Sequence, residues 1–325
     1  MPASQAIRIH QNGGPEELRL ETIEVGEPGP GEVRIRHTAI GLNFTDIHHR
    51  TGRYPGPGFP LTIGMEAAGV LEVVGSDVPE FRVGDRVAYV GTAPGAYCER
   101  RVMNAARLVK LPDWLDDETA AAVFLKGLTA QYLLRGAYRV ESGQTILVHA
   151  AAGGVGLLLT QIIKLRGGHV IGRVSSTDKT AVAREAGADH VIVDTEGRFA
   201  EEVVRLSGGE GVHVVYDGSG PKTFQASLDS LRRSGTFCWY GPVLGGPGPL
   251  DIMSLPKSIK IGYARFFDHI NTPALLRAHT RQLFDWIASC DLKIRIGGVY
   301  PLTEAARAHA DMESRGTTGK LLLIP

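Results

Sequence analysis

The sequence is poor in cysteine: its 325 residues include three, at positions 98, 238 and 290, and no C-x-x-C pair. This pattern excludes a disulfide framework and a cysteine-rich structural zinc site. The eleven histidines include no H-E-x-x-H spacing. The adjacent pair His48-His49 is interpreted as surface polarity and not as a metal site, because neighbouring side chains on a helix or strand point apart.

An excess of charge is also missing, since Lys+Arg and Asp+Glu both number 35. The balance argues against nucleic acid or an anionic membrane as the main partner. No apolar run approaches the roughly 18 residues of a membrane-spanning helix. The start, Met1-Pro-Ala-Ser-Gln5, has no basic patch followed by an apolar stretch. We therefore expect no signal peptide, no membrane contact and a cytoplasmic location.

Glycine is abundant, with 41 residues in a chain that is 43% hydrophobic, and this favours a turn-rich α/β protein. The length allows two domains. Residues 1–110 contain short alternating or apolar runs between Gly and Pro clusters, which predicts a compact β-barrel-like unit. The strands are expected at 6–10, 18–23, 32–39, 69–74, 83–88 and 95–98. A helix over 116–135, with acids in its first turn, is interpreted as a connector.

From residue 145 the pattern alternates strand and helix, which predicts a doubly wound parallel sheet covered on both faces. Strands are expected at 145–149, 169–174, 190–194, 212–217, 236–241 and 259–263. Helices are expected at 157–166, 178–186, 199–206 and 222–233. A further helix over 274–290 precedes a last strand, Lys320–Ile324, which we expect to return to the first domain.

The turn Ala151-Ala-Gly153-Gly154-Val155-Gly156 stands between the first of these strands and its helix. Glycines let a backbone approach a pyrophosphate, and the helix N-terminus offers unpaired N–H groups. The motif is imperfect because Ala151 replaces its first glycine, and a plain tight turn is the alternative. The strand-turn-helix context favours a Rossmann dinucleotide site formed by Gly153, Gly154, Val155 and Gly156.

The next strand indicates which dinucleotide is bound. In this fold an acid at its end bonds the ribose hydroxyls of NAD, but here the strand ends in Ser175-Ser176. Hydroxyls with a nearby ammonium, Ser175 and Lys179, would bind a 2′-phosphate, with Arg173 beside them. The alternative is a helix cap and a solvated lysine, and Asp178 and Asp194 lie near enough to oppose the phosphate. We expect NADPH over NADH.

Several motifs occur together in a familiar order: Gly41-Leu-Asn43-Phe-Thr45-Asp46, Gly64-Met-Glu66-Ala-Ala-Gly69, Val83-Gly-Asp85-Arg-Val87, Leu125-Lys126-Gly-Leu-Thr129 and the glycine turn. Together they resemble the zinc-free quinone oxidoreductases, the zeta-crystallin-like group of the medium-chain dehydrogenase/reductase superfamily. The resemblance runs to Gly319. It implies a GroES-like catalytic domain at 1–122, a Rossmann domain at 123–263, and a return to the catalytic domain over 264–325. It also implies a cleft between the domains and a homodimer, through the edge of the 236–241 or 259–263 strand.

The resemblance also addresses metal. Zinc-dependent members of the superfamily carry Cys at the position of Asn43 and His at that of Met65. An amide and a thioether are poor zinc ligands, so we expect no metal. An electron-poor quinone or enone needs no Lewis acid and is served by positioning and a hydrogen bond to the developing oxyanion.

Site residues are assigned by the same resemblance. Asn43 is expected to position the nicotinamide and the substrate carbonyl, and Tyr54 to donate its phenolic hydrogen, unless it merely packs beside Pro55. Asp46 is interpreted as holding the local turn in preference to transferring protons. Glu66 and Asp85 are interpreted as structural. The residues expected at the cofactor, beyond the glycine turn, Ser175 and Lys179, are Lys126, Thr129, Gly218, Tyr240, Gly241, Arg265, Arg315 and Lys320.

The sequence departs from the family at a few of these positions. Asp194 stands where relatives place a tyrosine near the adenosine phosphate, and Pro242 replaces an asparagine. Arg265 lies two residues beyond the aligned place of a pyrophosphate arginine, which Tyr263 fills. Lys320, alongside Arg315, is expected to compensate by its charge.

The leading hypothesis is a cytoplasmic, metal-free, NADPH-dependent quinone reductase. An enone or enal double-bond reductase would use the same cradle with another acceptor pocket. A different class is a non-enzymatic, nucleotide-dependent RNA-binding or crystallin-like protein, against which the balanced charge counts.

Overall fold

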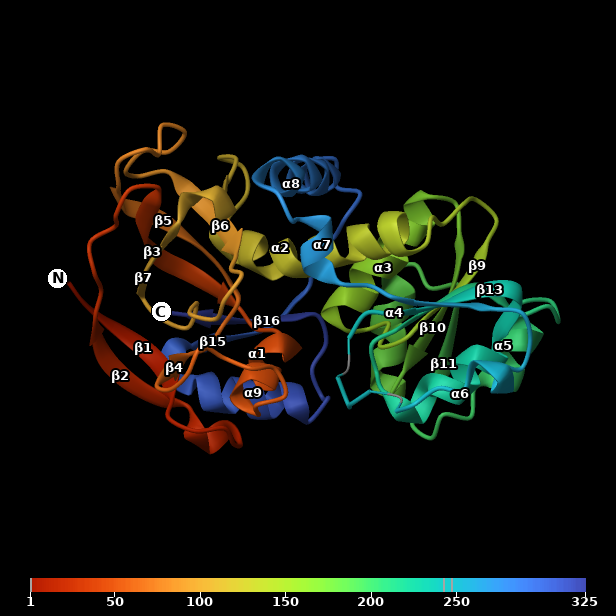
Figure 1. The fold of residues 1–325 in the computed structure, drawn as a ribbon. Helices are drawn as coiled ribbons and strands as arrows, with labels where there is room; N and C mark the ends of the chain where they lie inside the picture. Colours follow the sequence, from red (N-terminus) through yellow and green to blue (C-terminus); the bar gives the residue numbers. More distant parts are fainter. Residues whose placement is uncertain (1, 242, 247) are drawn as a thin grey trace. The chain divides into compact units, whose positions relative to one another are not determined.

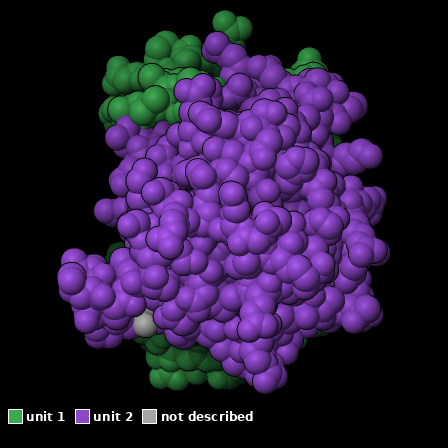
Figure 2. Space-filling model, turned by 90° about the vertical axis from the view of Figure 1, so that its right-hand side faces the viewer, with its two compact units in different colours: residues 1–125, 272–280, 294–325 green, residues 126–271, 281–293 purple. Residues whose placement is uncertain are grey.

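The computed structural model describes residues 2–241, 243–246 and 248–325. The chain divides into two compact units, which Figure 2 colours separately. The first unit comprises Met1–Leu125, Thr272–Thr280 and Ile294–Pro325, and the second comprises Lys126–Asn271 and Arg281–Lys293. None of the described helices is both long and apolar enough to cross a membrane.

The first unit is built mainly of β-structure. Its three-stranded sheet has the order β2-β1-β4, and its seven-stranded sheet has the order β15-β16-β3-β5-β6-β8, with β7 paired to β3. The strands are β1 (Ala3–Ile9), β2 (Arg19–Glu24), β3 (Glu32–Gly41), β4 (Leu61–Thr62), β5 (Glu66–Val74), β6 (Arg86–Val90), β7 (Arg100–Asn104), β8 (Leu108–Lys110), β15 (Ile296–Pro301) and β16 (Lys320–Ile324). Helices α1 (Phe44–Arg50) and α9 (Ala305–Glu313) belong to the same unit. The last strand, β16, pairs antiparallel with the end of β3, where Leu322 faces Gly41.

The second unit contains one six-stranded sheet of order β11-β10-β9-β12-β13-β14, and every pairing in it is parallel. Its strands are β9 (Thr145–Val148), β10 (His169–Val174), β11 (His190–Val193), β12 (Val212–Asp217), β13 (Leu231–Trp239) and β14 (Lys260–Tyr263). Helices lie against the sheet (Figure 1): α3 (Gly154–Leu165), α4 (Thr180–Glu185), α5 (Ala200–Leu206) and α6 (Pro221–Asp229). The predicted α/β fold, a doubly wound sheet with a GroES-like β-rich domain, is confirmed.

The described residues also form helices α2 (Asp117–Tyr132), α7 (Phe266–His269) and α8 (Pro273–Ala288). The acids predicted for the first turn of α2 are present, and Asp116 accepts the Thr119 N–H at 2.7 Å. This bond satisfies one of the N–H groups that a helix start leaves without an intrahelical partner. Beyond Tyr132 the helix widens into a π-helical turn, Leu133–Ala137.

Two local predictions were wrong. The helix predicted over 222–233 ends at Asp229, and β13 already begins at Leu231, which pairs with Val212. The apolar spacing from Leu228 to Leu231 fits a helix, but sheet pairing decides the second residue. The segment 95–98 forms no regular strand, since Cys98 makes only an isolated bridge to Ala6.

Candidate functional site

In the glycine turn of the second unit, the backbone at Gly156 passes close to the backbone at Ala150. The turn leaves β9 at Val148, and α3 begins at Gly154 after Gly153, whose N-cap position carries no side-chain hydrogen bond. A Cβ on Gly156 would lie 2.2 Å from the Ala150 carbonyl oxygen, so only glycine fits there. No side chain caps the first N–H groups of α3, which are the groups that the predicted pyrophosphate cradle would use.

Lys126, on α2, reaches the same turn. A Cβ added to Gly154 would lie 2.5 Å from Lys126 Cδ and 2.7 Å from its Nζ. Thr129 lies one turn further along α2 and is buried. The structure thus brings the Lys126 ammonium over the predicted cradle, where it would face a phosphate or ribose.

Residues after β12 and β13 lie at the same edge of the sheet. A Cβ on Gly218 would meet the Tyr240 ring at 2.9 Å, and Val243 N–H donates to the Gly218 carbonyl at 3.1 Å. Strand order reverses between β9 and β12, and ligands of open parallel sheets bind at such a reversal, beyond the carboxyl ends. Gly241 follows Tyr240 directly, and Pro242 lies outside the described residues.

The end of β10 carries the residues predicted for the 2′-phosphate. Lys179 Nζ donates to Ser175 Oγ at 3.3 Å, so the two side chains do meet. Arg173 is different, because its guanidinium is buried and ion-paired with Asp194 at 2.8 Å. The sequence places Arg173 and Asp194 near this strand but does not predict that they form an ion pair. Opposite charges at the ends of adjacent parallel strands are the signal that would have found the pair.

A buried polar network ties β9 to β12 and α6. Ser227 Oγ lies 3.0 Å from His149 Nε2 and donates to Asp217 Oδ2 at 3.2 Å, and Thr223 Oγ1 donates to the same oxygen at 2.7 Å. Because Ser227 donates its hydroxyl hydrogen to Asp217, His149 must donate from Nε2 to Ser227 Oγ. Burial lowers the pKa of His149 to about 4, so the ring is neutral. The network fixes the segments that follow β9 and β12.

In the first unit, Asn43 is surrounded by polar partners. Its Nδ2 donates to the Gly41 carbonyl at 3.1 Å and to Glu66 Oε1 at 2.8 Å, while its Oδ1 accepts from Lys320 Nζ at 3.0 Å. Lys320 also donates to Glu66, whose other oxygen accepts the Leu125 N–H at 2.7 Å. An ammonium can only donate, so the orientation of the Asn43 amide is determined.

Lys320 is almost completely buried, with 1% of its surface exposed, like Glu66 with 0%. Both donors of the Asn43 amide are used within the protein. What this side chain can still offer a ligand is one lone pair on Oδ1. The ammonium of Lys320 is directed at Asn43 and Glu66, which the sequence alone did not indicate.

Asp46, also fully buried, caps α1 by accepting the Asn43 N–H at 2.9 Å. Tyr97 donates its hydroxyl hydrogen to the same Asp46 oxygen at 3.0 Å, and His309 Nε2 lies 3.0 Å from that hydroxyl. Burial raises the pKa of Asp46 to about 7, against the lowering effect of the Asn43 N–H and the Lys320 charge. Asp46 therefore holds the turn that carries Asn43.

Tyr54 is half-buried, and its ring makes edge contacts with His48 and His49 at centroid distances of 4.9 and 5.8 Å. The prediction that these two histidines lie on the surface was wrong, because they are 4% and 9% exposed. They lie in the last turn of α1, which packs into the unit instead of facing water.

The remaining predicted cations lie in different parts of the chain. Arg265 is exposed at the start of α7 in the second unit. Arg315 is exposed just after α9 in the first unit, with a left-handed φ of 61°. Lys320 is the one of the three that is buried.

Comparison with known proteins gives consistent matches. Residues 29–113 match the alcohol dehydrogenase GroES-like domain, and residues 186–323 match the zinc-binding dehydrogenase family. The chain is 44% identical to a quinone oxidoreductase of Pseudomonas aeruginosa, covering 99% of this chain and 100% of the relative. It is 40% identical to a 2-haloacrylate reductase of a Burkholderia species, covering 98% of each.

A solved structure agrees. The crystal structure of the Escherichia coli quinone oxidoreductase complexed with NADPH has a TM-score of 0.96 and 39% identity, over 99% of this chain and 100% of that one. With these full-length similarities, the predicted resemblance is confirmed: the chain is an oxidoreductase that belongs to the quinone oxidoreductases of the medium-chain dehydrogenase/reductase superfamily.

Proposed function

We propose that this protein is an NADPH-dependent quinone reductase that transfers reducing equivalents to a small quinone without a metal ion. Full-length similarity to quinone oxidoreductases, including one complexed with NADPH, is the observation that carries the proposal. When bound, NADPH supplies the hydride. The position of the quinone between the two domains stays a prediction from the resemblance.

The residues present fit the cofactor. The Ala150 carbonyl oxygen lies 2.2 Å from where a Cβ on Gly156 would stand, and the Lys126 ammonium lies over the turn. Ser175 and Lys179, joined at 3.3 Å, supply a hydroxyl and an ammonium at the end of β10. Gly154 and Val155 would offer N–H groups to the pyrophosphate, whereas the Gly153 N–H already donates to the Ala150 carbonyl at 2.8 Å; Gly218 and Tyr240 would lie along the rim.

Independence from metal is supported by the donor set around Asn43. A zinc ion needs anionic or imidazole ligands, but the Asn43 and Glu66 oxygens here already hold the Lys320 ammonium. A cation added beside it would be repelled in a buried site. The Lys320 ammonium therefore neutralises the Glu66 carboxylate without a metal ion.

The roles of the side chains follow from the hydrogen bonds. Asn43 can accept a hydrogen from the nicotinamide group through Oδ1, but its amide hydrogens are not available to a substrate oxygen. We propose that the hydroxyl of the half-buried Tyr54, which the resemblance assigns to the site, donates to the developing oxyanion. Tyr54→Phe should lower kcat roughly tenfold with little change in the NADPH Kd.

A double-bond reductase remains the second candidate, because the 2-haloacrylate reductase is 40% identical over nearly the whole chain. Such an enzyme would use the same cofactor cradle. The two activities differ in the acceptor, since an activated alkene takes its hydride at carbon.

Steady-state oxidation of NADPH and NADH with 1,4-benzoquinone and with a 2-alkenal, each with and without a chelator, tests the proposal. We expect NADPH-dependent turnover of the quinone that the chelator does not change. Preferred turnover of the alkenal would assign the second candidate. Loss of activity with the chelator would overturn the metal-free mechanism, and no turnover with either acceptor would favour a nucleotide-binding protein.

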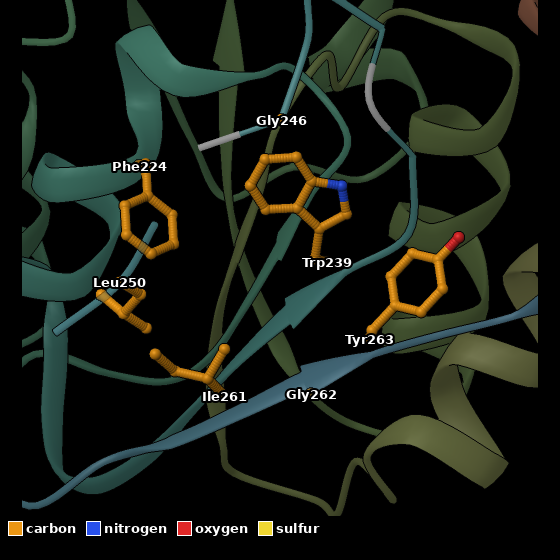
Figure 3. Close-up of a pocket in the computed structure, with 7 residues that line it drawn as sticks. All are labelled: Phe224, Trp239, Gly246, Leu250, Ile261, Gly262 and Tyr263. Carbon is orange, nitrogen blue, oxygen red and sulfur yellow. The ribbon is translucent and has the colours of Figure 1, made fainter. Parts of the chain in front are cut away.

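We further propose a homodimer through the edge of β14. Residues 236–241 are excluded as an edge because β13 pairs on both sides, whereas β14 pairs with β13 alone among the described strands. Ile261 and Tyr263 on β14 are 40% and 69% exposed. An apolar cavity of about 360 Å³ lies beside them, and in Figure 3 the side chains of Phe224, Trp239 and Leu250 gather around Ile261.

An unpaired strand edge with an apolar face is suited to pairing with a second copy. Light scattering after gel filtration should give twice the chain mass for the wild type and a single chain mass for Ile261→Asp. Leu165→Asp changes an exposed apolar residue elsewhere, on α3 and 46% exposed, and should leave the dimer intact. A monomeric wild type would refute this interface.

A further inference from the structure

The ends of β10 and β11 bring together two opposite charges. The strands are parallel neighbours with Val174 facing Val193, and the Asp194 N–H donates to the Val174 carbonyl at 3.0 Å. Asp194 therefore lies directly beside the point where β10 ends and Ser175 begins. In dinucleotide folds this point faces the adenosine ribose, and a carboxylate there bonds the ribose hydroxyls of NAD.

Asp194 is nevertheless fully engaged by the protein. Arg173 binds Asp194 Oδ2 through Nε at 2.9 Å and through a second nitrogen at 2.8 Å. The backbone N–H groups of residues 196, 197 and 198 donate to the two carboxylate oxygens at 2.9–3.2 Å. Burial alone would raise the pKa of Asp194, but the Arg198 N–H and the Arg173 guanidinium outweigh it, and the pKa lies below its ordinary value.

Arg173 is held in place from a second side. Its guanidinium carbon lies 5.2 Å from the centre of the Phe199 ring, and the side chains of Arg173 and Asp194 are 6% and 9% exposed. A guanidinium that lies over an aromatic ring and is bound to a carboxylate has little freedom to move. The carboxylate is thus paired before any ligand arrives.

We propose that Arg173 is a specificity-determining residue that favours NADPH by neutralising Asp194. The inference rests on the proposed function, and it deepens it. Arg173 is not itself a ligand of the 2′-phosphate. It cancels the charge of the carboxylate that would otherwise repel this phosphate and would accept from the 2′-hydroxyl of NADH.

The charge of an unpaired Asp194 would oppose the binding of NADPH but not that of NADH. A 2′-phosphate carries a charge of about −1.5 to −2 at neutral pH, so an unpaired carboxylate beside it weakens binding, whereas the NADH hydroxyl is neutral. The surrounding charges are Lys179 and the exposed Asp178 and Arg198, together with the exposed pair of Lys222 and Glu196. Once Arg173 cancels Asp194, the ammonium of Lys179, which donates to Ser175 Oγ at 3.3 Å, is the group that we propose binds the phosphate.

Dissociation constants for NADPH and NADH, measured by fluorescence titration at low salt, test the inference. Arg173→Gln should weaken NADPH binding by on the order of tenfold, or 1.4 kcal/mol, with NADH binding unchanged or tighter. Asp194→Asn should leave NADH binding unchanged and tighten NADPH binding, because it leaves the charge of Arg173 without its carboxylate partner. The double variant should return the ratio of the two constants to near the wild-type value.

Asp189→Asn is the matched control, because Asp189 precedes β11 as Asp194 follows it, and it is also ion-paired, with Lys164 at 2.8 Å. It lies at the opposite end of the strand, so the ratio should not change. Circular dichroism checks the folding of each variant. If Arg173→Gln fails to fold, the Asp194→Asn result still decides.

A weaker NADH complex in Asp194→Asn would show that the carboxylate binds the ribose, and would overturn the inference. Equal ratios in the wild type, Arg173→Gln and Asp194→Asn would overturn it too. Failure of the wild type to bind either nucleotide would instead refute the proposed function.

Discussion

Replacement of Lys320 by methionine should destabilise this protein strongly. The ammonium is 1% exposed and bonds Asn43 and Glu66, and Glu66 is itself completely buried. Methionine has a similar length but no charge, so the variant leaves a carboxylate buried with only the Asn43 and Leu125 N–H donors. The loss of stability therefore measures how strongly Lys320, Glu66 and Asn43 hold one another.

The magnitude follows from the burial of both partners. Removing one partner of a buried ion pair costs about 3–5 kcal/mol, because the remaining charge is uncompensated. Adding Glu66→Gln removes that charge, so the double variant should recover about 2 kcal/mol relative to Lys320→Met. A surface pair behaves differently and contributes about 0–1 kcal/mol.

Urea unfolding of the single and double variants measures these free energies. Lys164→Met is the control, since Lys164 and Asp189 are 33% and 32% exposed. If Lys320→Met costs no more than this control, the buried cluster does not stabilise the fold as reasoned. A raised NADPH Kd in folded Lys320→Met would instead support the sequence-based assignment of Lys320 to the cofactor.

Two other predictions concern the cradle and the dependence of stability on pH. Gly156→Ala should abolish NADPH binding in a titration, because its Cβ meets backbone at 2.2 Å, whereas Gly154→Ala displaces only the flexible Lys126 side chain and should bind within about tenfold of wild type; equal affinities would contradict the geometry. Four buried histidines have pKa values that burial lowers to about 3–4, below the ordinary 6.5, so the unfolded chain binds protons that the native chain does not, and stability is lost as pH falls from about 7 to about 4. Asp46, with its pKa raised to about 7, opposes this by one proton, so urea midpoints should fall between pH 7 and pH 5 with a net uptake of about three protons on unfolding, and a flat or rising profile would refute it. The histidines are His37, His48, His149 and His309.

The sequence predicted the elements of the sheet closely. Strands 169–174, 212–217 and Lys320–Ile324 have the predicted bounds, and the glycine turn precedes α3 as expected. These features depend on local physics: alternating or continuous apolar runs, helical periodicity, and glycine where the backbone must turn. The family resemblance added the order of the motifs.

The tertiary structure alone decided which charges meet. Lys320 and Asn43 are 277 residues apart in the chain, and Arg173 and Asp194 are 21 apart, yet each pair is in contact. The sequence could name these side chains as candidates but not pair them. Strand order and register determine which residues become neighbours, and burial then makes each charge require a partner, so the long-range pairing of the polar residues is set by the folded sheet and not by any local pattern.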